Sequence, residues 1–118
     1  MDSLLILQSN GQNKENWKKV NIKLPYKIMD HGAQFLKNSL YVFGGQTEKN
    51  EILNLTYKLS RTLKWEQMAD MNDKRCLISN SNLVLNDKIW VFGGWNEEEV
   101  FKSVEMYDPS RNKWEYMK

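Results

Sequence analysis

The chain has 118 residues, of which 41% are hydrophobic and 27% charged, a balance typical of one modest globular domain. Its 17 Lys and Arg against 15 Asp and Glu give a net charge of +2, without the basic excess expected for nucleic acids or anionic membranes. One cysteine, Cys76, and one histidine, His31, leave no internal disulfide, no cysteine-based zinc site and no His-pair metal site, so we expect no cofactor.

The first segment, residues 1–25, contains a strand-like apolar run at Leu4–Leu7 and a tryptophan at Trp17. The run is shorter than the roughly 7–15 residues of a signal peptide core or the roughly 20 of a membrane span. No basic stretch precedes it. We therefore expect a cytoplasmic protein with no membrane association.

The second segment, residues 26–70, alternates apolar and polar residues in short runs separated by turn-forming residues, which is typical of β-strands. The predicted strands are residues 35–36, 39–43 and 53–59, and the predicted turns are residues 37–38 and 60–62. The central strand ends at Gly44-Gly45. His31 stands at the start of the first strand, where we expect a structural role.

The third segment, residues 71–118, repeats this order. The predicted strands are residues 83–85, 88–92, 100–107 and one that begins at residue 113, with turns at Asn86-Asp87 and Asp108-Pro109. No stretch keeps a period of 3.6 residues, so we predict no helix. Cys76 is expected in a half-buried strand; the alternative is a reactive thiol whose pKa is lowered by Arg75.

Two markers share one spacing along the chain. Gly44 and Gly93 are 49 residues apart, and so are Trp65 and Trp114, while Trp17 lies 48 residues before Trp65. The period is close to the roughly 50 residues of one four-stranded propeller blade. Large aromatic side chains that one sheet cannot bury alone are covered by the next sheet, so we interpret the tryptophans as packing residues rather than ligand platforms.

Four stretches resemble kelch repeats: residues 41–45, 90–94, 103–109 and 112–114. The resemblance implies an all-β, kelch-type β-propeller fragment of about two and a half four-stranded antiparallel blades, divided into a partial blade (1–25, its last two strands) and two repeats (26–70 and 71–118). The residues that carry the repeat motif are Gly44, Gly45, Trp65, Gly93, Gly94, Glu105, Tyr107 and Trp114. The first repeat departs from the motif, with Thr56-Tyr57-Lys58 where Glu-x-Tyr is expected and Ile28 near the usual arginine.

A closed propeller needs roughly 4–8 blades. We therefore expect a fragment, a truncated gene product, or a chain that needs further blades or self-association to close. Open blade faces are apolar, so the isolated chain is expected to be oligomeric or poorly soluble.

The candidate partner-binding residues follow the second diglycine or precede the last repeat's first strand. The acidic run Glu97-Glu98-Glu99, with Trp95 and Phe101 as apolar neighbours, suggests a contact for a basic protein partner; the alternative is a solvated loop. Arg75 lies in the connection that, by the resemblance, shares a face with this loop, and a bidentate arginine suits a partner's carboxylate. The alternative for Arg75 is a surface charge or a side chain held by loop carbonyls.

The sequence contains no phosphate-binding loop, nucleophile elbow or dinucleotide fingerprint, so we expect no enzyme. The resemblance implies a protein–protein interaction module. In many kelch proteins a BTB domain precedes the propeller and recruits a cullin-type ubiquitin ligase, and the propeller selects the substrate. We therefore expect the substrate-recognition part of such an adaptor or a truncated derivative, with actin binding and a remnant of a propeller enzyme as alternatives.

Overall fold

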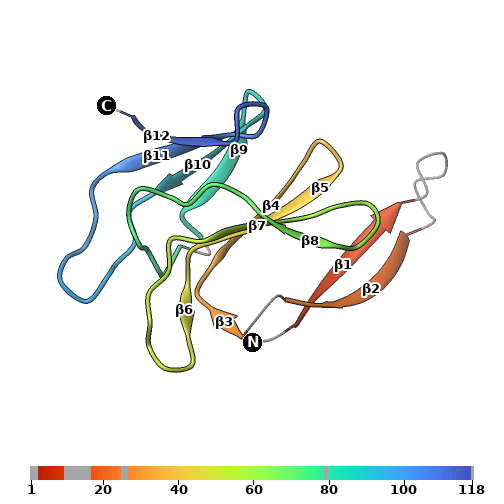
Figure 1. Cartoon of the computed structure of the whole chain (residues 1–118), viewed down its shortest axis with the longest axis horizontal. Helices are drawn as coiled ribbons and strands as arrows, with labels where there is room; N and C mark the ends of the chain where they lie inside the picture. Colours follow the sequence, from red (N-terminus) through yellow and green to blue (C-terminus); the bar gives the residue numbers. More distant parts are fainter. Residues whose placement is uncertain (1–2, 10–16, 25–26, 79, 118) are drawn as a thin grey trace.

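The computed structural model describes residues 3–9, 17–24, 27–78 and 80–117. Within these ranges the secondary structure is entirely β (Figure 1), with no helix and hence none fit to cross a membrane. The all-β fold expected from the sequence is confirmed.

The strands form three antiparallel sheets and one short strand pair. A two-stranded sheet contains β1 (Ser3–Ser9) and β2 (Trp17–Lys23). The next sheet has the order β4 (Gly32–Leu36), β5 (Ser39–Phe43), β7 (Thr56–Leu59), β8 (Trp65–Gln67). The last has the order β9 (Asn82–Leu85), β10 (Lys88–Phe92), β11 (Val104–Asp108), β12 (Lys113–Met117). The short pair joins β3 (Ile28–Met29) to β6 (Gln46–Thr47).

The first hairpin of each four-stranded sheet has a two-residue turn in which both residues have positive φ. The angles are 51° and 67° at Lys37 and Asn38, and 54° and 59° at Asn86 and Asp87. This geometry matches the right-handed twist of the flanking strands. Both turns predicted from the sequence are confirmed.

The third strand of each sheet begins later than its alternating pattern predicts. Residues 100–103 lie outside β11, and residues 53–55 lie outside β7. The diglycines explain this, because positive φ at Gly93 and Gly94 (73° and 95°) ends β10 and leaves residues 100–103 without a regular strand to pair with. Single backbone hydrogen bonds, such as Phe101 N to Gly94 O at 2.9 Å, replace the ladder.

Strand pairing also corrects the alignment of the two repeats. Tyr57 lies opposite Val42, as Glu105 lies opposite Val91, so Tyr57-Lys58-Leu59 rather than Thr56-Tyr57-Lys58 occupies the Glu-x-Tyr positions. The loop after the first diglycine is one residue longer than its counterpart, and the turn after β7 is one residue shorter than the turn after β11. The extra residue in the first loop and the missing residue in the turn cancel. The diglycines and the tryptophans therefore both keep a spacing of 49, and this spacing does not reveal the one-residue shift at Tyr57.

The larger core lies between the two four-stranded sheets. Its buried residues are Leu36, Tyr41, Phe43, Met71, Ile78, Ile89, Val91, Tyr107 and Trp114. Trp114 spans the interface: its ring packs on Phe43 and Tyr107 at centroid distances of 5.7 and 5.0 Å, and its Nε1 donates to Thr56 Oγ1 at 3.0 Å. A second cluster contains Leu24, Ile28, Leu40, Val42 and Leu59, with half-buried Trp65 against it. The side chain of Trp17 lies outside the described part.

Candidate functional site

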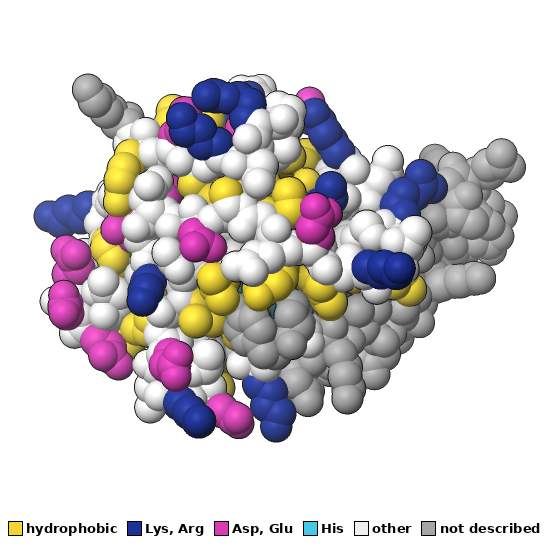
Figure 2. Space-filling view, in the orientation of Figure 1, with side chains coloured by type: hydrophobic (Ala, Val, Ile, Leu, Met, Phe, Trp, Pro, Cys, Tyr) yellow, Lys and Arg dark blue, Asp and Glu magenta, His cyan; other side chains and the backbone are white. Residues whose placement is uncertain are grey.

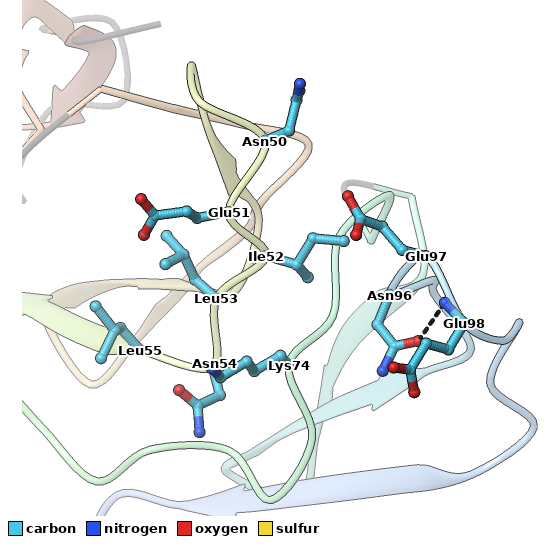
Figure 3. A pocket seen from close by; sticks show the side chains of 10 residues that line it. All are labelled: Asn50, Glu51, Ile52, Leu53, Asn54, Leu55, Lys74, Asn96, Glu97 and Glu98. Atoms are coloured by element: carbon cyan, nitrogen blue, oxygen red, sulfur yellow. Dashed lines mark hydrogen bonds between the residues drawn. The ribbon is translucent and has the colours of Figure 1, made fainter.

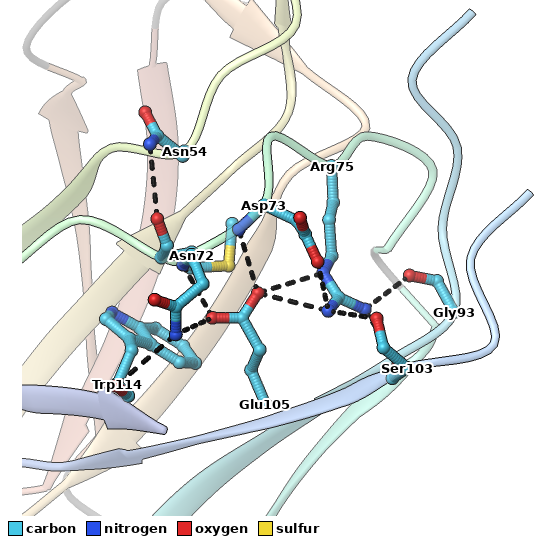
Figure 4. Close-up of polar contacts among 9 residues, drawn as sticks. Asn54, Asn72, Asp73, Arg75, Gly93, Ser103, Glu105 and Trp114 are labelled. Atoms are coloured by element: carbon cyan, nitrogen blue, oxygen red, sulfur yellow. Dashed lines mark hydrogen bonds and ion pairs between the residues drawn. The ribbon is translucent and has the colours of Figure 1, made fainter. Parts of the chain in front are cut away.

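The connection between the two four-stranded sheets contains Arg75, whose side chain is fully buried at 0% exposure. Its Nη1 donates to the carbonyl oxygens of Gly93 and Ser103, both at 2.9 Å. Its Nε and Nη2 lie 3.2 and 3.0 Å from Glu105 Oε2, and Nη2 also donates to Ser103 Oγ at 2.8 Å. Figure 4 shows these groups surrounding the guanidinium, whose N–H groups therefore form their hydrogen bonds inside the fold.

Glu105, on β11, is equally buried and accepts further hydrogen bonds from the connection. The backbone nitrogens of Asn72 and Asp73 donate to its carboxylate at 2.6 and 3.1 Å, and Asn72 Nδ2 donates at 3.0 Å. A buried ion pair is tolerated only when such bonds satisfy its remaining polar atoms. The pair thus anchors the connection to the last sheet.

The burial of Arg75 argues against its expected contact with a partner. The structure supports the alternative stated above, in which loop carbonyls hold the arginine. Phe101, another candidate contact, covers this group: its ring centroid lies 4.9 Å from the guanidinium carbon of Arg75. Phe101 is half-buried and therefore serves the interior at least in part.

The first repeat lacks both members of this ion pair. Backbone pairing places Ile28 where the second repeat has Arg75, and Tyr57 where it has Glu105. The second repeat thus has both charged residues and the first has neither, so neither repeat buries a single unpaired charge at these positions, which would be costly.

A groove of about 550 Å³ separates the loops that follow the two diglycines (Figure 3). Its lining residues are Asn50, Glu51, Ile52, Leu53, Asn54, Leu55, Lys74, Asn96, Glu97 and Glu98. The side chains of Ile52 and Glu97 face each other across the gap, with Lys74 between the walls, whereas Glu51 points away. Both loops and the connection therefore contribute to one face, as the resemblance implied.

The acidic loop is held by Asn96 in a tight turn. Asn96 Oδ1 accepts hydrogen bonds from the backbone nitrogens of Glu98 and Glu99 at 3.2 and 3.1 Å, and Glu97 has a φ of 75°. Asparagine side chains favour such turns. All three glutamates are exposed, and among the described residues none forms an ion pair with them. Their carboxylates face solvent from an ordered backbone.

Beside this loop lies an apolar pocket of about 340 Å³, lined by Leu77, Gly94, Trp95 and Val100. Leu77 and Val100 are 53% and 73% exposed, and Trp95 is half-buried. The Trp95 backbone pairs with Cys76 on one side and Val100 on the other, and these two pairings hold the backbone under the pocket in place. We call residues 50–55, 74, 77 and 94–101 together the loop face.

Figure 2 shows acidic side chains gathered at the lower left, over the ends of the two loops drawn there in Figure 1. Basic side chains are interspersed but fewer in this region. The near-neutral net charge of the chain thus conceals a locally acidic surface.

The lone cysteine is buried and the lone histidine is half-buried. Burial, and next the charge of Asp30, raises the pKa of the Cys76 thiol, and its Sγ donates to Trp95 O at 3.3 Å. The alternative of a lowered thiol pKa is therefore wrong. Burial lowers the pKa of His31, whose Nδ1 has no hydrogen-bond partner in the described part. No three His, Cys, Asp or Glu side chains of the described ranges cluster as metal ligands would.

Sequence reasoning missed several loop-face residues, among them Lys74, Leu77 and Val100. Their side chains were read as part of a connection or a strand. Alignment of the repeats by strand pairing sets Leu77 against Asp30. The sequence spacing of 49 sets Leu77 against Ile28 instead, so this polar-to-apolar exchange could not be read from the sequence.

The four-stranded sheets, each with a loop after its diglycine, are typical of a kelch-type protein. Comparison with known proteins leads to the same class. Residues 2–118 match the family described as KLHDC2/KLHL20/DRC7 Kelch-repeats domain, and the chain belongs to this family. Spermatocyte protein spe-26 of Caenorhabditis elegans is 37% identical over 105 residues, covering 83% of this chain and 18% of that protein. Kelch-like protein 41a of Danio rerio is 33% identical over 94 residues, covering 79% and 15%.

A solved structure titled "Structure of YjhT" superimposes with a TM-score of 0.77 at 19% identity, covering 98% of this chain and 44% of that one. This likeness shows the fold: a kelch-type propeller fragment whose sheets are successive blades. The chain spans less than a fifth of the length of the two curated relatives above.

Proposed function

We propose that this chain is a protein-interaction module that binds a protein partner through its loop face. The observation that carries the proposal is the division of its charged residues. Arg75 and Glu105 are buried and paired with each other in the interior. Glu97, Glu98 and Glu99 are instead exposed, on a turn fixed by Asn96. Loops on a rigid β-scaffold commonly carry recognition.

The groove and the apolar pocket give this face the composition of an interface. Exposed apolar side chains at Leu77 and Val100 lie beside half-buried Trp95, and tryptophan is enriched among residues that dominate binding energy. The exposed residues Glu97, Glu98 and Glu99 lie between Trp95 and Val100 in the sequence and supply polar groups of the kind found at an interface rim. The buried thiol of Cys76 adds no reactive group, and we propose a non-enzymatic role.

A finer proposal concerns the longer protein. One relative, 32% identical over 90 residues, is named Kelch repeat and BTB domain-containing protein F47D12.7 of Caenorhabditis elegans, and the match covers 71% of this chain and 15% of that protein. By this similarity we propose that the chain is the substrate-recognition part of a cytoplasmic BTB-kelch-like ubiquitin-ligase adaptor or a derivative of one. We also propose the division into a partial blade at 1–25 and repeats at 26–70 and 71–118.

Partner capture with matched variants tests the module. The groove variant Glu97→Gln/Glu98→Gln removes two charges from the loop face. The control Asp87→Asn/Glu66→Gln removes two exposed charges elsewhere; Asp87 lies just before the opposite end of β10, roughly 20 Å from the diglycine at about 3.4 Å per residue. We expect the groove variant to lose proteins that wild type and control both retain in quantitative mass spectrometry. Identical partner sets for all three would contradict the proposal.

A further inference from the structure

We infer that the loop face of the second repeat binds a peptide segment that presents an apolar side chain close to a lysine or arginine. The apolar side chain would rest on Leu77, Trp95 and Val100, and the basic group would lie beside Glu97 and Glu98. This inference deepens the proposed function and rests on it.

The first step compares equivalent positions in the two repeats. In the first repeat Asp30 and Gln46 occupy this place, and Gln46 Nε2 donates to Asp30 Oδ2 at 2.8 Å. In the second repeat the matching residues are Leu77 and Trp95, and Leu77 keeps the positive φ of Asp30 (60° against 56°). The same backbone thus carries a hydrogen-bonded polar pair in one repeat and an apolar pair in the other.

The second step concerns exposure. Leucine at a positive φ is conformationally unfavourable, and an exposed leucine gains little from burial to offset this. Leu77 is 53% exposed and Val100 is 73% exposed, on either side of Trp95. A contiguous apolar pocket with no use in the described fold is typical of a contact surface.

The third step is charge complementarity. Glu97 and Glu98 follow Trp95 by two and three residues, line the adjacent groove, and have no ion pair with any described residue. Lys74 is the one cation among the lining residues, against the carboxylates of Glu97 and Glu98, whereas Glu51 points away from the groove. A positively charged partner group is therefore favoured, and an acidic one is disfavoured.

The fourth step is preorganisation. Trp95 N and O both bond to Cys76, at 3.1 and 3.0 Å, and Asn96 N donates to Glu99 O at 3.2 Å. A backbone that is already held by such hydrogen bonds loses little conformational freedom on binding. The acidic residues Glu97 and Glu98 follow the apolar Trp95 by only two and three positions. The apolar and the basic residue of the partner should therefore be similarly close in its sequence.

The test uses the full chain and an array of 12-residue synthetic peptides. Each peptide carries one Leu, Phe or Trp and one Arg at spacings of one to four residues. Matched peptides replace Arg by Glu, or the apolar residue by Ser. The strongest binders are then measured by fluorescence anisotropy at low and high salt. We expect each replacement to weaken binding about tenfold or more, and high salt to weaken the Arg peptides selectively.

Two variants assign the two subsites. Leu77→Asp/Trp95→Gln copies the Asp30–Gln46 pair of the first repeat and should fold; it is expected to lose the preference for the apolar residue. Glu97→Gln/Glu98→Gln is expected to lose the preference for Arg over Glu. Circular dichroism and thermal melts verify that both variants are folded.

Three results would overturn the inference. One is equal binding of Arg and Glu peptides by wild type; another is unchanged selectivity in both variants. The third is self-association of wild type that Leu77→Asp/Trp95→Gln abolishes without any peptide binding, since a second copy of the chain would then cover the pocket. If partner capture still depends on Glu97 and Glu98 in these cases, the proposed function stands and only the ligand chemistry is wrong.

Discussion

At the scale of residues, burial separates charges with structural roles from charges available to a partner. Arg75 and Glu105 lie 3.0 Å apart at 0% exposure and have hydrogen bonds on every side. Arg111 forms a pair of similar chemistry with Glu115 at 3.5 Å, but at 59% exposure. The two arginines should therefore differ widely in their contribution to stability.

We predict that Arg75→Met lowers the free energy of unfolding by about 3–5 kcal/mol, because it leaves Glu105 as a buried charge without its cation. The matched control Arg111→Met should change it by less than about 1 kcal/mol. Urea unfolding followed by tryptophan fluorescence measures both. Similar effects of the two substitutions would show that the buried pair does not anchor the connection.

The Cys76 thiol should be unreactive in the folded chain. It is fully buried, and burial raises its pKa, so both access and the thiolate fraction are low. We expect its reaction with a disulfide reagent at pH 8 to be slow and to accelerate in urea in parallel with unfolding. Rapid labelling of fully folded protein would place the thiol at the surface instead.

At the scale of elements, the two diglycines have the same backbone conformation but different neighbours. Gly44 and Gly93 have φ of 65° and 73°. A Cβ at Gly44 would lie 2.7 Å from the Arg75 carbonyl oxygen and 2.8 Å from Ile78, whereas at Gly93 the nearest atom is the Phe101 carbonyl oxygen, 3.7 Å away. The connection to the following sheet fills the space at Gly44.

Alanine at the two positions separates these effects. Gly93→Ala should cost about 1–2 kcal/mol from the positive φ alone. Gly44→Ala should cost about 1–3 kcal/mol more, because the backbone of the connection must move. Thermal and urea unfolding of both variants measure the difference. Equal destabilisation would mean that the connection does not pack on the first diglycine.

The repeat spacing and the turn residues were enough to predict the sheets, both first hairpins and the diglycine ends of β5 and β10. They did not predict the late starts of β7 and β11 or the one-residue shift at Tyr57, because compensating loop lengths leave the spacing intact. The acidic loop was foreseen as a surface feature. The burial of Arg75 was predicted only as an alternative, since it depends on the carbonyl oxygens of Gly93 and Ser103, which meet Arg75 only in the fold.

At the scale of the whole molecule, the last sheet has one uncovered face. Leu85 and Phe92 are 54% and 37% exposed, whereas their equivalents in the preceding sheet, Leu36 and Phe43, are buried against it. A further blade or a second copy would remove this apolar area from water.

We predict that the isolated chain self-associates through this face. Leu83→Glu/Leu85→Lys should shift it towards monomer in sedimentation velocity, because charges are placed on β9. Leu63→Lys, at an exposed turn residue outside this sheet, should leave the association unchanged. A wild-type chain that is monomeric at all concentrations would contradict the prediction.

The most direct test of the loop face as a recognition surface is site-specific photo-crosslinking in cells. A photoreactive residue is placed at Val100, on the loop face, or at Leu63, in the turn between β7 and β8. Both side chains are apolar and exposed, at 73% and 49%, and differ chiefly in position. We predict discrete protein adducts at Val100 that Glu97→Gln/Glu98→Gln diminishes, and none of these adducts at Leu63. The same adducts at both positions, or adducts at Leu63 alone, would contradict the account.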